Sequence, residues 1–441
     1  MKKILVRCGM LPYETFNDFE LLDRDRFGSN NGNLIYQYSV IRTIMNEDVQ
    51  VFSDHFSTNY NKSHEINEKY DTYIIPLADA FRKDFIPNLR NYTKLIRKLR
   101  IPVIVIGVGL KAPYDYDVTK GFPFDKDVKD FMNAVLEKSN IVGLRGQLTA
   151  DYLEHLGFEP EKDFTVIGCP SMYTFGRNLK LKEISLTNDS LISLNASNIA
   201  NDESMNYLTS IATKYKNYYF IPQSYKEFLL NYFGFGQIEN VVDKFPQNIA
   251  SKFYKEGRVK YFLNAQTWFN YMKEASLSIG TRLHGNIVAT INQTPSITII
   301  HDARMRELSD YHGLPSITPE KLKDYDTIES LINAIDFTLV EKLQPARFDH
   351  FIDFLNKNNI SHIYQDNLNR TDAPLDDLIK DVDFDTPIDT INIIDEENRA
   401  RRLIGGFEIY TNRNERLQNK KLNALLSENK KLKANINKLI N

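Results

Sequence analysis

The chain has 441 residues, of which 42% are hydrophobic and 26% charged, a composition typical of a globular protein with two to three domains. Its formal net charge of −3 gives no bulk reason to expect a nucleic-acid partner. The two cysteines show neither a C-x-x-C motif nor a metal-ligand spacing, and no apolar run is long enough for a signal peptide or a membrane span. We therefore expect a cytoplasmic protein without a structural metal.

The N-terminal part of the chain alternates short apolar runs with helical patterns. Strands are predicted at residues 3–8, 49–52, 72–76, 101–106, 141–144 and 164–167, and helices at 34–45, 91–100, 124–139 and 148–156. This alternation predicts a parallel sheet covered by helices. Arg145 follows one predicted strand at its carboxyl end, where such sheets bind ligands, although a surface arginine at a helix start fits the pattern equally well.

The first predicted loop is unusually long. About 25 residues separate the strand at 3–8 from the helix at 34–45, whereas most connections have a few. Loops of this length are commonly functional, and this one ends in Gly32 and Asn33, with Asn33 placed as the N-cap of the helix. Ordinary turn chemistry explains its Asn and Gly content about as well.

The strongest candidate site lies between residues 277 and 315. Apolar runs at 277–279 and 296–300 predict strands, and the spacing of apolar residues between them predicts a helix. Arg282 and His284 fall in the turn that opens this helix, and His301, Asp302, Arg304 and Arg306 follow the second strand. Cations are disfavoured at a helix N-terminus, so their presence indicates a bound anion. A lone histidine there would more often be a core residue, but the clustered arginines favour a site.

A second alternating series follows a polar segment at residues 179–190. It comprises predicted strands at 191–194 and 218–221, helices at 205–214 and 262–275, and the charged unit just described. The fold class predicted is therefore α/β, with two doubly wound, Rossmann-like domains at residues 1–185 and 186–345 and a cleft between them.

The C-terminal part departs from this alternation. In residues 346–405, Phe348, Phe351, Ile352 and Leu355 have helical spacing and are expected to pack on the core. From residue 371 to 398, ten acidic residues face one lysine, which is typical of a solvated linker, with an exposed ordered surface as the alternative.

The last segment, residues 406–441, is predicted to be a basic amphipathic helix. Its heptad pattern indicates a coiled coil and hence a homo-oligomer; the a and d positions are Leu422, Leu425, Asn429, Leu432, Ile436 and Leu439. Packing against the core and peripheral contact with an anionic membrane surface are the alternatives.

The charged unit resembles the signature of the polysaccharide pyruvyltransferases. That signature has an R-x-H turn opening a helix, a strand led by proline, and an aromatic-Asp-x-Lys turn; this chain has Arg282-Leu283-His284, Pro295 and His301-Asp302-Ala303-Arg304. Gly32-Asn33 and Arg145 also occupy positions where the family has such residues. Two departures stand out, because Arg304 replaces a lysine and the segment 76–81 replaces a glycine run.

The resemblance implies a two-domain fold like that of the GT-B glycosyltransferases. It also implies transfer of an enolpyruvyl unit, usually as a ketal, from phosphoenolpyruvate to a glycan or lipid-linked saccharide during synthesis of capsule or exopolysaccharide, in the cytoplasm or at the inner face of the membrane. No cofactor beyond this donor substrate is expected.

The same resemblance assigns roles to the site residues. The donor would bind Arg145, Arg282 and Arg304, with Gly32 and Asn33 beside them. His284 would either protonate the donor methylene or only bind phosphate. The alternative function is that of a GT-B-type glycosyltransferase using a nucleotide sugar. The Asp115-x-Asp117 pair resembles a metal motif of other glycosyltransferases, but paired loop carboxylates are common and we expect no metal site.

Overall fold

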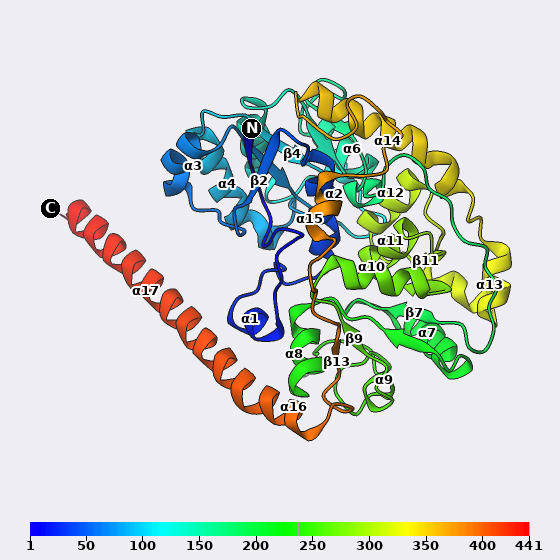
Figure 1. Cartoon of the computed structure of the whole chain (residues 1–441). Helices are drawn as coiled ribbons and strands as arrows, with labels where there is room; N and C mark the ends of the chain where they lie inside the picture. The colour runs from blue at the N-terminus through cyan, green and yellow to red at the C-terminus, as the bar shows by residue number, and fades with distance from the viewer. Residues whose placement is uncertain (237, 441) are drawn as a thin grey trace.

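Two parallel β-sheets, each flanked by helices, form the body of the protein (Figure 1). The computed structural model describes residues 1–236 and 238–440, and describes their side chains except at 424, 428 and 431–440. The N-terminal sheet has the order β2-β1-β3-β4 and consists of β1 (Lys2–Val6), β2 (Val49–Ser53), β3 (Thr72–Pro76) and β4 (Val103–Ile106). A parallel bridge between Val108 and Leu144 continues it into the pair β5 (Val142–Leu144) and β6 (Phe164–Val166).

Helices flank both faces of this sheet. They are α2 (Gly32–Ile44), α3 (Ser63–Lys69), α4 (Ile86–Lys98), α5 (Asp125–Leu136) and α6 (Gln147–His155). Three of them lie within three residues of the helices predicted at 34–45, 124–139 and 148–156, the one predicted at 91–100 begins at Ile86, and α3 has no counterpart among the predicted helices. The strands β3 and β4 are almost entirely buried, as the continuous apolar runs predict for a parallel sheet covered on both sides.

The C-terminal sheet repeats the same strand order when it is read from its β8 edge. It runs β12-β11-β10-β7-β8, with β7 (Ile192–Asn195), β8 (Tyr218–Phe220), β10 (Leu277–Gly280), β11 (Ser296–Ile299) and β12 (Ser316–Ile317). Its helices are α7 (Asp202–Lys214), α8 (Tyr225–Phe233), α9 (Lys252–Lys255), α10 (Ala265–Glu274), α11 (Leu283–Ile291), α12 (Ala303–His312) and α13 (Ile328–Ala334). The predicted fold class, two doubly wound units facing a cleft, is confirmed.

This strand order places one ligand-binding position in each sheet. Connections from the first strand of each unit run in opposite directions on its two sides, so a crevice opens between β1 and β3 and another between β7 and β10. The boundary predicted at residue 185 stays a prediction, although the second sheet does begin after it, at β7.

Two local predictions for the first loop are wrong. The loop contains a short helix, α1 (Asp18–Asp23), and the helix predicted to start after Asn33 starts at Gly32. Asn31 occupies the N-cap position, and its side chain makes no capping hydrogen bond. The amide of Asn33 instead donates to the carbonyl of Phe27 at 2.8 Å, so it stabilises the loop and not the helix end.

The chain returns to the N-terminal unit through α14 (Leu339–Lys357). The expectation that this helix packs on the core is confirmed, because Phe348, Phe351, Ile352 and Leu355 are all buried.

The acidic segment is not a solvated linker. Residues 371–402, which we call the strap, contain α15 (Pro374–Ile379), β13 (Ile388–Asp389) and α16 (Glu396–Arg401), and β13 pairs with β9 (Lys260–Tyr261). Leu375 is fully buried, and Asp376 accepts hydrogen bonds from Arg42 of α2 at 2.6 and 2.9 Å. A few buried apolar side chains and ion pairs to distant residues therefore hold an acidic segment against the body.

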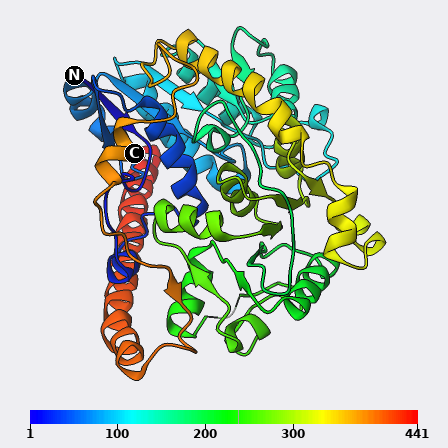
Figure 2. The same ribbon diagram turned by 45° about the vertical axis from the view of Figure 1, so that its right-hand side comes forward.

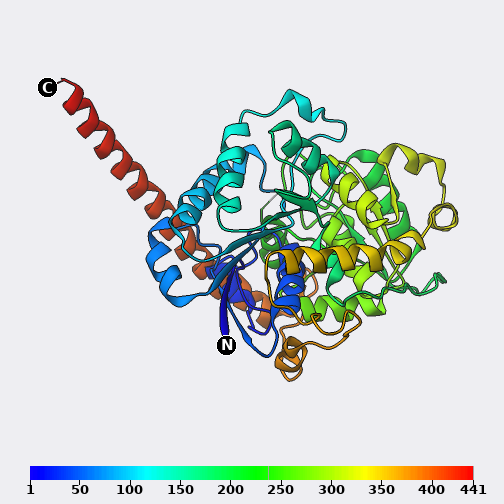
Figure 3. The ribbon, with the colours of Figure 1, turned by 90° about the horizontal axis from the view of Figure 1, so that it is seen from above.

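The last helix, α17 (Phe407–Ile440), leaves the body after its first turns. Arg413 stacks over the ring of Tyr225 at 4.6 Å, and Arg416 pairs with Asp23. Beyond these contacts the helix projects away from the body in Figures 1 and 3, while in Figure 2 it is seen along the left part of the body. Leu422 and Leu425 are 54% and 51% exposed, so they do not pack on the core. The side chains of the later heptad positions Leu432, Ile436 and Leu439 lie outside the described residues, and the coiled coil stays a prediction. Among the described residues, no helix is long and apolar enough to cross a membrane.

Candidate functional site

A cavity of about 330 Å³ lies at the crevice of the N-terminal sheet and is closed by the C-terminal unit. Arg7 follows β1 and Asp79 follows β3, so both stand at the position where doubly wound sheets bind ligands. Arg145 enters from the end of β5. His284, in the first turn of α11, and Arg304, in the first turn of α12, complete the lining from the other unit. The structure thus brings Arg145, His284 and Arg304 together.

An ion-pair cluster forms the floor of this cavity. The guanidinium of Arg145 is fully buried, donates to the carbonyl of Gly107 at 3.2 Å and lies 5.3 Å from the ring centre of Tyr36. The carboxylate of Asp79 pairs with Arg145 at 3.5 Å and also with Arg304. Burial alone would raise the pKa of Asp79, but Arg304, Arg145 and Arg82 outweigh it and lower the pKa to about 2. Asp79 is therefore ionised at neutral pH.

The lining of the cavity nevertheless holds more cations than carboxylates. Four guanidinium groups, those of Arg7, Arg82, Arg145 and Arg304, line it with one carboxylate, that of Asp79, while outside the lining Asp84 pairs with Arg82 at 3.1 Å and Asp302 with Arg304 at 3.3 Å. The Nε atom of Arg304 is buried and has no hydrogen-bond partner in the described part of the chain. Buried polar groups are normally paired, so this donor and the surplus of cations in the lining indicate an anionic ligand.

His284 stands at the mouth of this cluster as a neutral imidazole. Its Nε2 lies 3.8 Å from the sulfur of Cys169, and the N-cap residue of α11, Arg282, makes no capping hydrogen bond with its side chain. Burial, together with the charges of Arg145 and Arg304, lowers the pKa of His284 to about 3. An anion bound at the helix N-terminus would raise that pKa, because it favours the charged imidazolium.

Gly32 and Asn33 lie beside this histidine. A Cβ atom on Gly32 would be 3.0 Å from the Cβ of His284, so a larger residue here would be tightly crowded against the histidine. Asn33 lines the cavity directly. Cys169 is fully buried, and its sulfur lies 3.8 Å from Nη2 of Arg145 and 3.8 Å from Nε2 of His284.

Arg282 does not line the cavity. It pairs with Glu227 at 2.5 Å and donates from Nε to the carbonyl of Ala196 at 2.9 Å, so its charge is neutralised at the crevice of the C-terminal sheet. The structure therefore separates Arg282 from Arg145 and Arg304, with which the family resemblance groups it.

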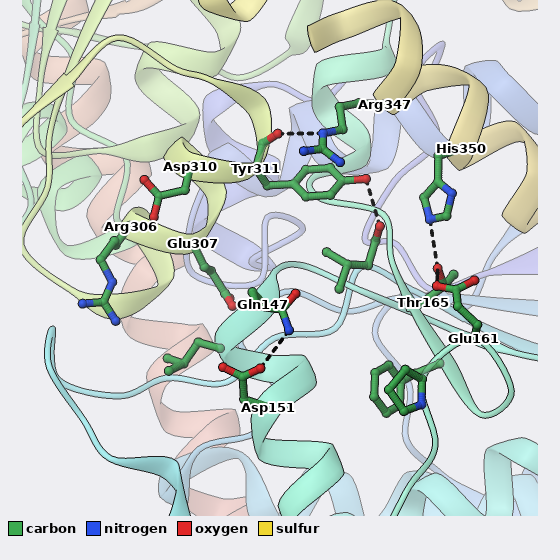
Figure 4. A pocket seen from close by; sticks show the side chains of 14 residues that line it. Gln147, Asp151, Glu161, Thr165, Arg306, Glu307, Asp310, Tyr311, Arg347 and His350 are labelled. Atoms are coloured by element: carbon green, nitrogen blue, oxygen red, sulfur yellow. Dashed lines mark hydrogen bonds between the residues drawn. The ribbon is translucent and has the colours of Figure 1, made fainter.

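Arg306 belongs to a second cavity, of about 630 Å³, between α6, α12 and α14 (Figure 4). Figure 4 shows Arg347 against the ring of Tyr311, at 4.1 Å from the ring centre, with Arg306 at the opposite side. Arg306 pairs with Asp115 at 3.1 Å, so this carboxylate of the Asp115-x-Asp117 motif is engaged by a cation. Four carboxyl groups, those of Asp151, Glu161, Glu307 and Asp310, line this cavity with two arginines, so among the described residues it lacks the surplus of cations found in the lining of the first.

Sequence reasoning missed Arg7, Asp79, Arg82 and Tyr36. For Asp79 a signal existed, because it closely follows the strand predicted at 72–76, at the same edge of the sheet as Arg145, whereas Arg7 falls inside the strand predicted at 3–8 and follows the strand only because β1 ends at Val6. Tyr36 looks like an ordinary core residue in sequence, yet its hydroxyl donates to the carbonyls of Leu77 and Ile106, at 3.1 and 2.5 Å, and its ring lies under Arg145.

Fold and cavity together define an α/β protein of two doubly wound units with an anion-binding cleft between them. The sequence profile of a family described as polysaccharide pyruvyl transferase matches residues 29–303, which include most of the cavity residues. The chain belongs to the polysaccharide pyruvyl transferase family and is a transferase that acts on polysaccharide.

Other comparisons give only distant similarity, and no curated protein matches the chain. Similar solved structures include S. aureus MnaA determined with UDP, at 14% identity over 82% of this chain and 99% of that chain with a TM-score of 0.43. The UDP-GlcNAc 2-epimerase of Methanocaldococcus jannaschii shares 15% identity over 80% and 99%, and that of Neisseria meningitidis 9% over 81% and 100%, both with TM-scores of 0.43. Similarity at this level carries no inference about activity.

Proposed function

We propose that the donor is phosphoenolpyruvate and that the enzyme transfers its pyruvyl unit to sugar hydroxyls as a ketal. The observation that carries this proposal is the set of four guanidinium groups around one carboxylate in a cavity of about 330 Å³. The donor bears a phosphate and a carboxylate, and both anions are small enough to share such a cavity. Arginine offers paired donors that suit both groups, so Arg145 and Arg304 would hold the two ends of one ligand.

His284 is the proposed proton donor. In this step the imidazolium protonates the donor methylene, the first sugar oxygen bonds to the adjacent carbon, and that hydroxyl's proton returns to His284. The oxygen of the second hydroxyl then forms the other C–O bond of the ketal as the C–O bond to phosphate breaks, and the proton of that hydroxyl leaves with the phosphate. Because the ligand-free imidazole is neutral, the bound phosphate has to supply the negative charge that keeps it protonated.

We also propose that the free part of α17 joins copies of the chain. Its exposed Leu422 and Leu425 begin a heptad pattern, and a single helix projecting into water is marginal alone. Contact of its lysines with an anionic membrane, where lipid-linked saccharides reside, is the alternative, and it predicts binding to anionic vesicles without a change in mass.

Calorimetric titration separates the proposed donor from the nucleotide sugar of a glycosyltransferase. We expect phosphoenolpyruvate to bind and Arg145→Ala to abolish its binding. The matched control is Arg90→Ala, because Arg90 is an exposed arginine that pairs with Asp127 away from the cavity. Binding of UDP-sugars, with no heat from phosphoenolpyruvate, would overturn the proposal in favour of the glycosyltransferase.

A further inference from the structure

The crevice of the C-terminal sheet holds a second cluster of polar side chains. Arg282 stands there between β7 and β10, where its backbone N–H donates to the side chain of Asn195 at 2.7 Å. Gln223 follows β8, Glu227 lies in the first turn of α8, and His301 follows β11. This is the position equivalent to that of the anion cavity in the N-terminal sheet.

Several polar atoms of this cluster lack a partner within the chain. Among the described residues, Nε2 of Gln223 and Oε1 of Glu227 have no hydrogen-bond partner, and Nε2 of His301 lies 3.7 Å from a carboxylate oxygen of Asp302, beyond hydrogen-bond distance. Gln223 and Glu227 are each 2% exposed, and the His301 side chain is 10% exposed. Leaving such groups unpaired costs about 1–3 kcal/mol each, so their concentration at a sheet crevice indicates a ligand.

The charge of the cluster excludes another anion as the best ligand. Arg282 is neutralised by Glu227, and the second oxygen of that carboxylate-bearing side chain remains free to accept a hydrogen bond. The N-terminus of α8 is closed by a capping box between Ser224 and Glu227 and offers nothing to a phosphate. What remains is one amide donor, one carboxylate acceptor and an imidazole that can do both, which matches hydroxyl groups.

The cluster adjoins the anion cavity. A Cβ atom on Gly285, the residue after His284, would lie 2.7 Å from Nε2 of Gln223. The backbone N–H of Asn31 donates to the carbonyl of Gln223 at 2.9 Å, so the loop that lines the anion cavity also rests on this cluster. A ligand held here would reach the donor past His284.

We propose that His301, Gln223 and Glu227 form the subsite that binds the hydroxyl groups of the acceptor sugar, with His301 as a specificity-determining residue. This inference rests on the proposed function. Burial and the charges of Arg304 and Arg282 lower the pKa of His301, although Asp302 opposes them, so the ring is neutral and presents one donor and one acceptor.

Saturation-transfer NMR on the full chain tests the subsite. The probes are the methyl glycosides of galactose, glucose, mannose and N-acetylglucosamine, each titrated with phosphoenolpyruvate present, and UDP as the anionic comparison. We expect at least one glycoside to bind, and His301→Phe and Gln223→Leu each to weaken that binding by about fivefold to a hundredfold. The control is His350→Phe, because His350 lines the other cavity.

Two further measurements keep the outcome decisive. Thermal unfolding establishes that both variants fold. Phenylalanine is chosen at position 301 because its ring fills about the same volume as the imidazole, so the substitution should not disturb the packing. Calorimetric titration with phosphoenolpyruvate should give the same affinity in both variants as in the wild type. Failure of the wild type to bind this donor would overturn the proposed function. If the donor binds normally, three results would each overturn the subsite proposal alone. They are a wild type that binds no glycoside, variants that bind the glycoside as well as the wild type does, and displacement of the glycoside by UDP.

Discussion

The two sheet crevices of this protein share a topology and differ in charge. At the crevice of the N-terminal sheet, the carboxylate of Asp79 is the one acidic group that the structure describes in a cavity lining that contains four guanidinium groups. At the crevice of the C-terminal sheet, the charge of Arg282 is neutralised by Glu227. The second carboxylate oxygen of Glu227 and the amide nitrogen of Gln223 there have no hydrogen-bond partner among the described residues. This difference suggests how equivalent positions of one fold come to bind different ligands. A carboxylate that neutralises the arginine, as Glu227 does for Arg282, removes the positive charge that would attract an anion, and the neutral polar groups that are left suit the proposed sugar hydroxyls.

The largest effect should come from the histidine between the two crevices. Replacing His284→Gln should lower turnover by about 10²–10⁴, because an amide can still accept or donate a hydrogen bond but cannot transfer a proton. Donor affinity, measured by calorimetry, should change by much less. If affinity and turnover fall together, His284 only binds phosphate, and turnover within a few-fold of wild type at saturating donor would remove it as the acid.

Arg304 tests the anionic crevice itself. Arg304→Ala should weaken phosphoenolpyruvate binding by about tenfold to a hundredfold, the value of a hydrogen bond to a charged group, while Arg304→Lys should retain measurable binding. Glycoside binding at the other crevice should be unaffected. Equal donor affinities for wild type and the alanine variant would place Arg304 outside the site.

The pH dependence should separate the free enzyme from its donor complex. The acid works only when protonated, so both kcat/KM and kcat should fall as pH rises. Burial, with Arg145 and Arg304, holds the pKa of His284 at about 3 before the donor binds, and the bound phosphate raises it. The fall in kcat should therefore lie at higher pH than the fall in kcat/KM, by more than one pH unit. Coincident profiles would contradict this coupling.

A smaller effect is expected at Asp79. Asp79→Asn removes the carboxylate that pairs with Arg145 and Arg304, so inorganic phosphate should bind more tightly, by about fivefold for one charge at a contact distance in a water-like medium. The control is Asp84→Asn, because Asp84 is an exposed carboxylate that pairs with Arg82 nearby. Unchanged or weaker phosphate binding by the Asp79 variant, with the fold intact, would show that Asp79 mainly positions the arginines.

The smallest effect on either crevice should come from the free helix. Deleting residues 416–441 should leave donor and glycoside affinities within twofold of the wild type and lower the mass measured by light scattering. Leu422→Lys with Leu425→Lys should do the same, whereas Leu417→Lys, which is equally exposed but off the heptad stripe, should not. An unchanged mass in the deletion variant would argue against assembly through α17.

Much of the fold was predictable because it depends on local patterns. The continuous apolar runs identify β3 and β10, and the family resemblance groups Arg145 with Arg304, which the structure brings into one cavity. What failed depended on partners far away in the chain. Arg282 looks like its neighbours in sequence, and only the folded chain reveals Glu227, 55 residues earlier, as its counter-charge.

The strap shows the same limit. Its acidic composition is that of a solvated segment, but Asp376 meets Arg42 across 334 residues, and Leu375 fills a core position. No local pattern encodes such a pairing. Asp79 lies in the segment that departs from the family's glycine run, and Arg304 is the second departure from the family pattern. The sequence shows both departures but not that these two residues form an ion pair with each other.

The path of the strap restricts how the cleft can open. It is tied to α2 of the N-terminal unit through Arg42 and Asp376, to the C-terminal unit through β13 and β9, and back to α1 by the paired hydrogen bonds of Arg401 to Asp18 at 2.7 and 2.8 Å. A hinge rotation that swung the units apart would have to break at least one of these ties. Opening of the cleft is therefore coupled to the strap, and any motion that separates the two units also has to displace this segment.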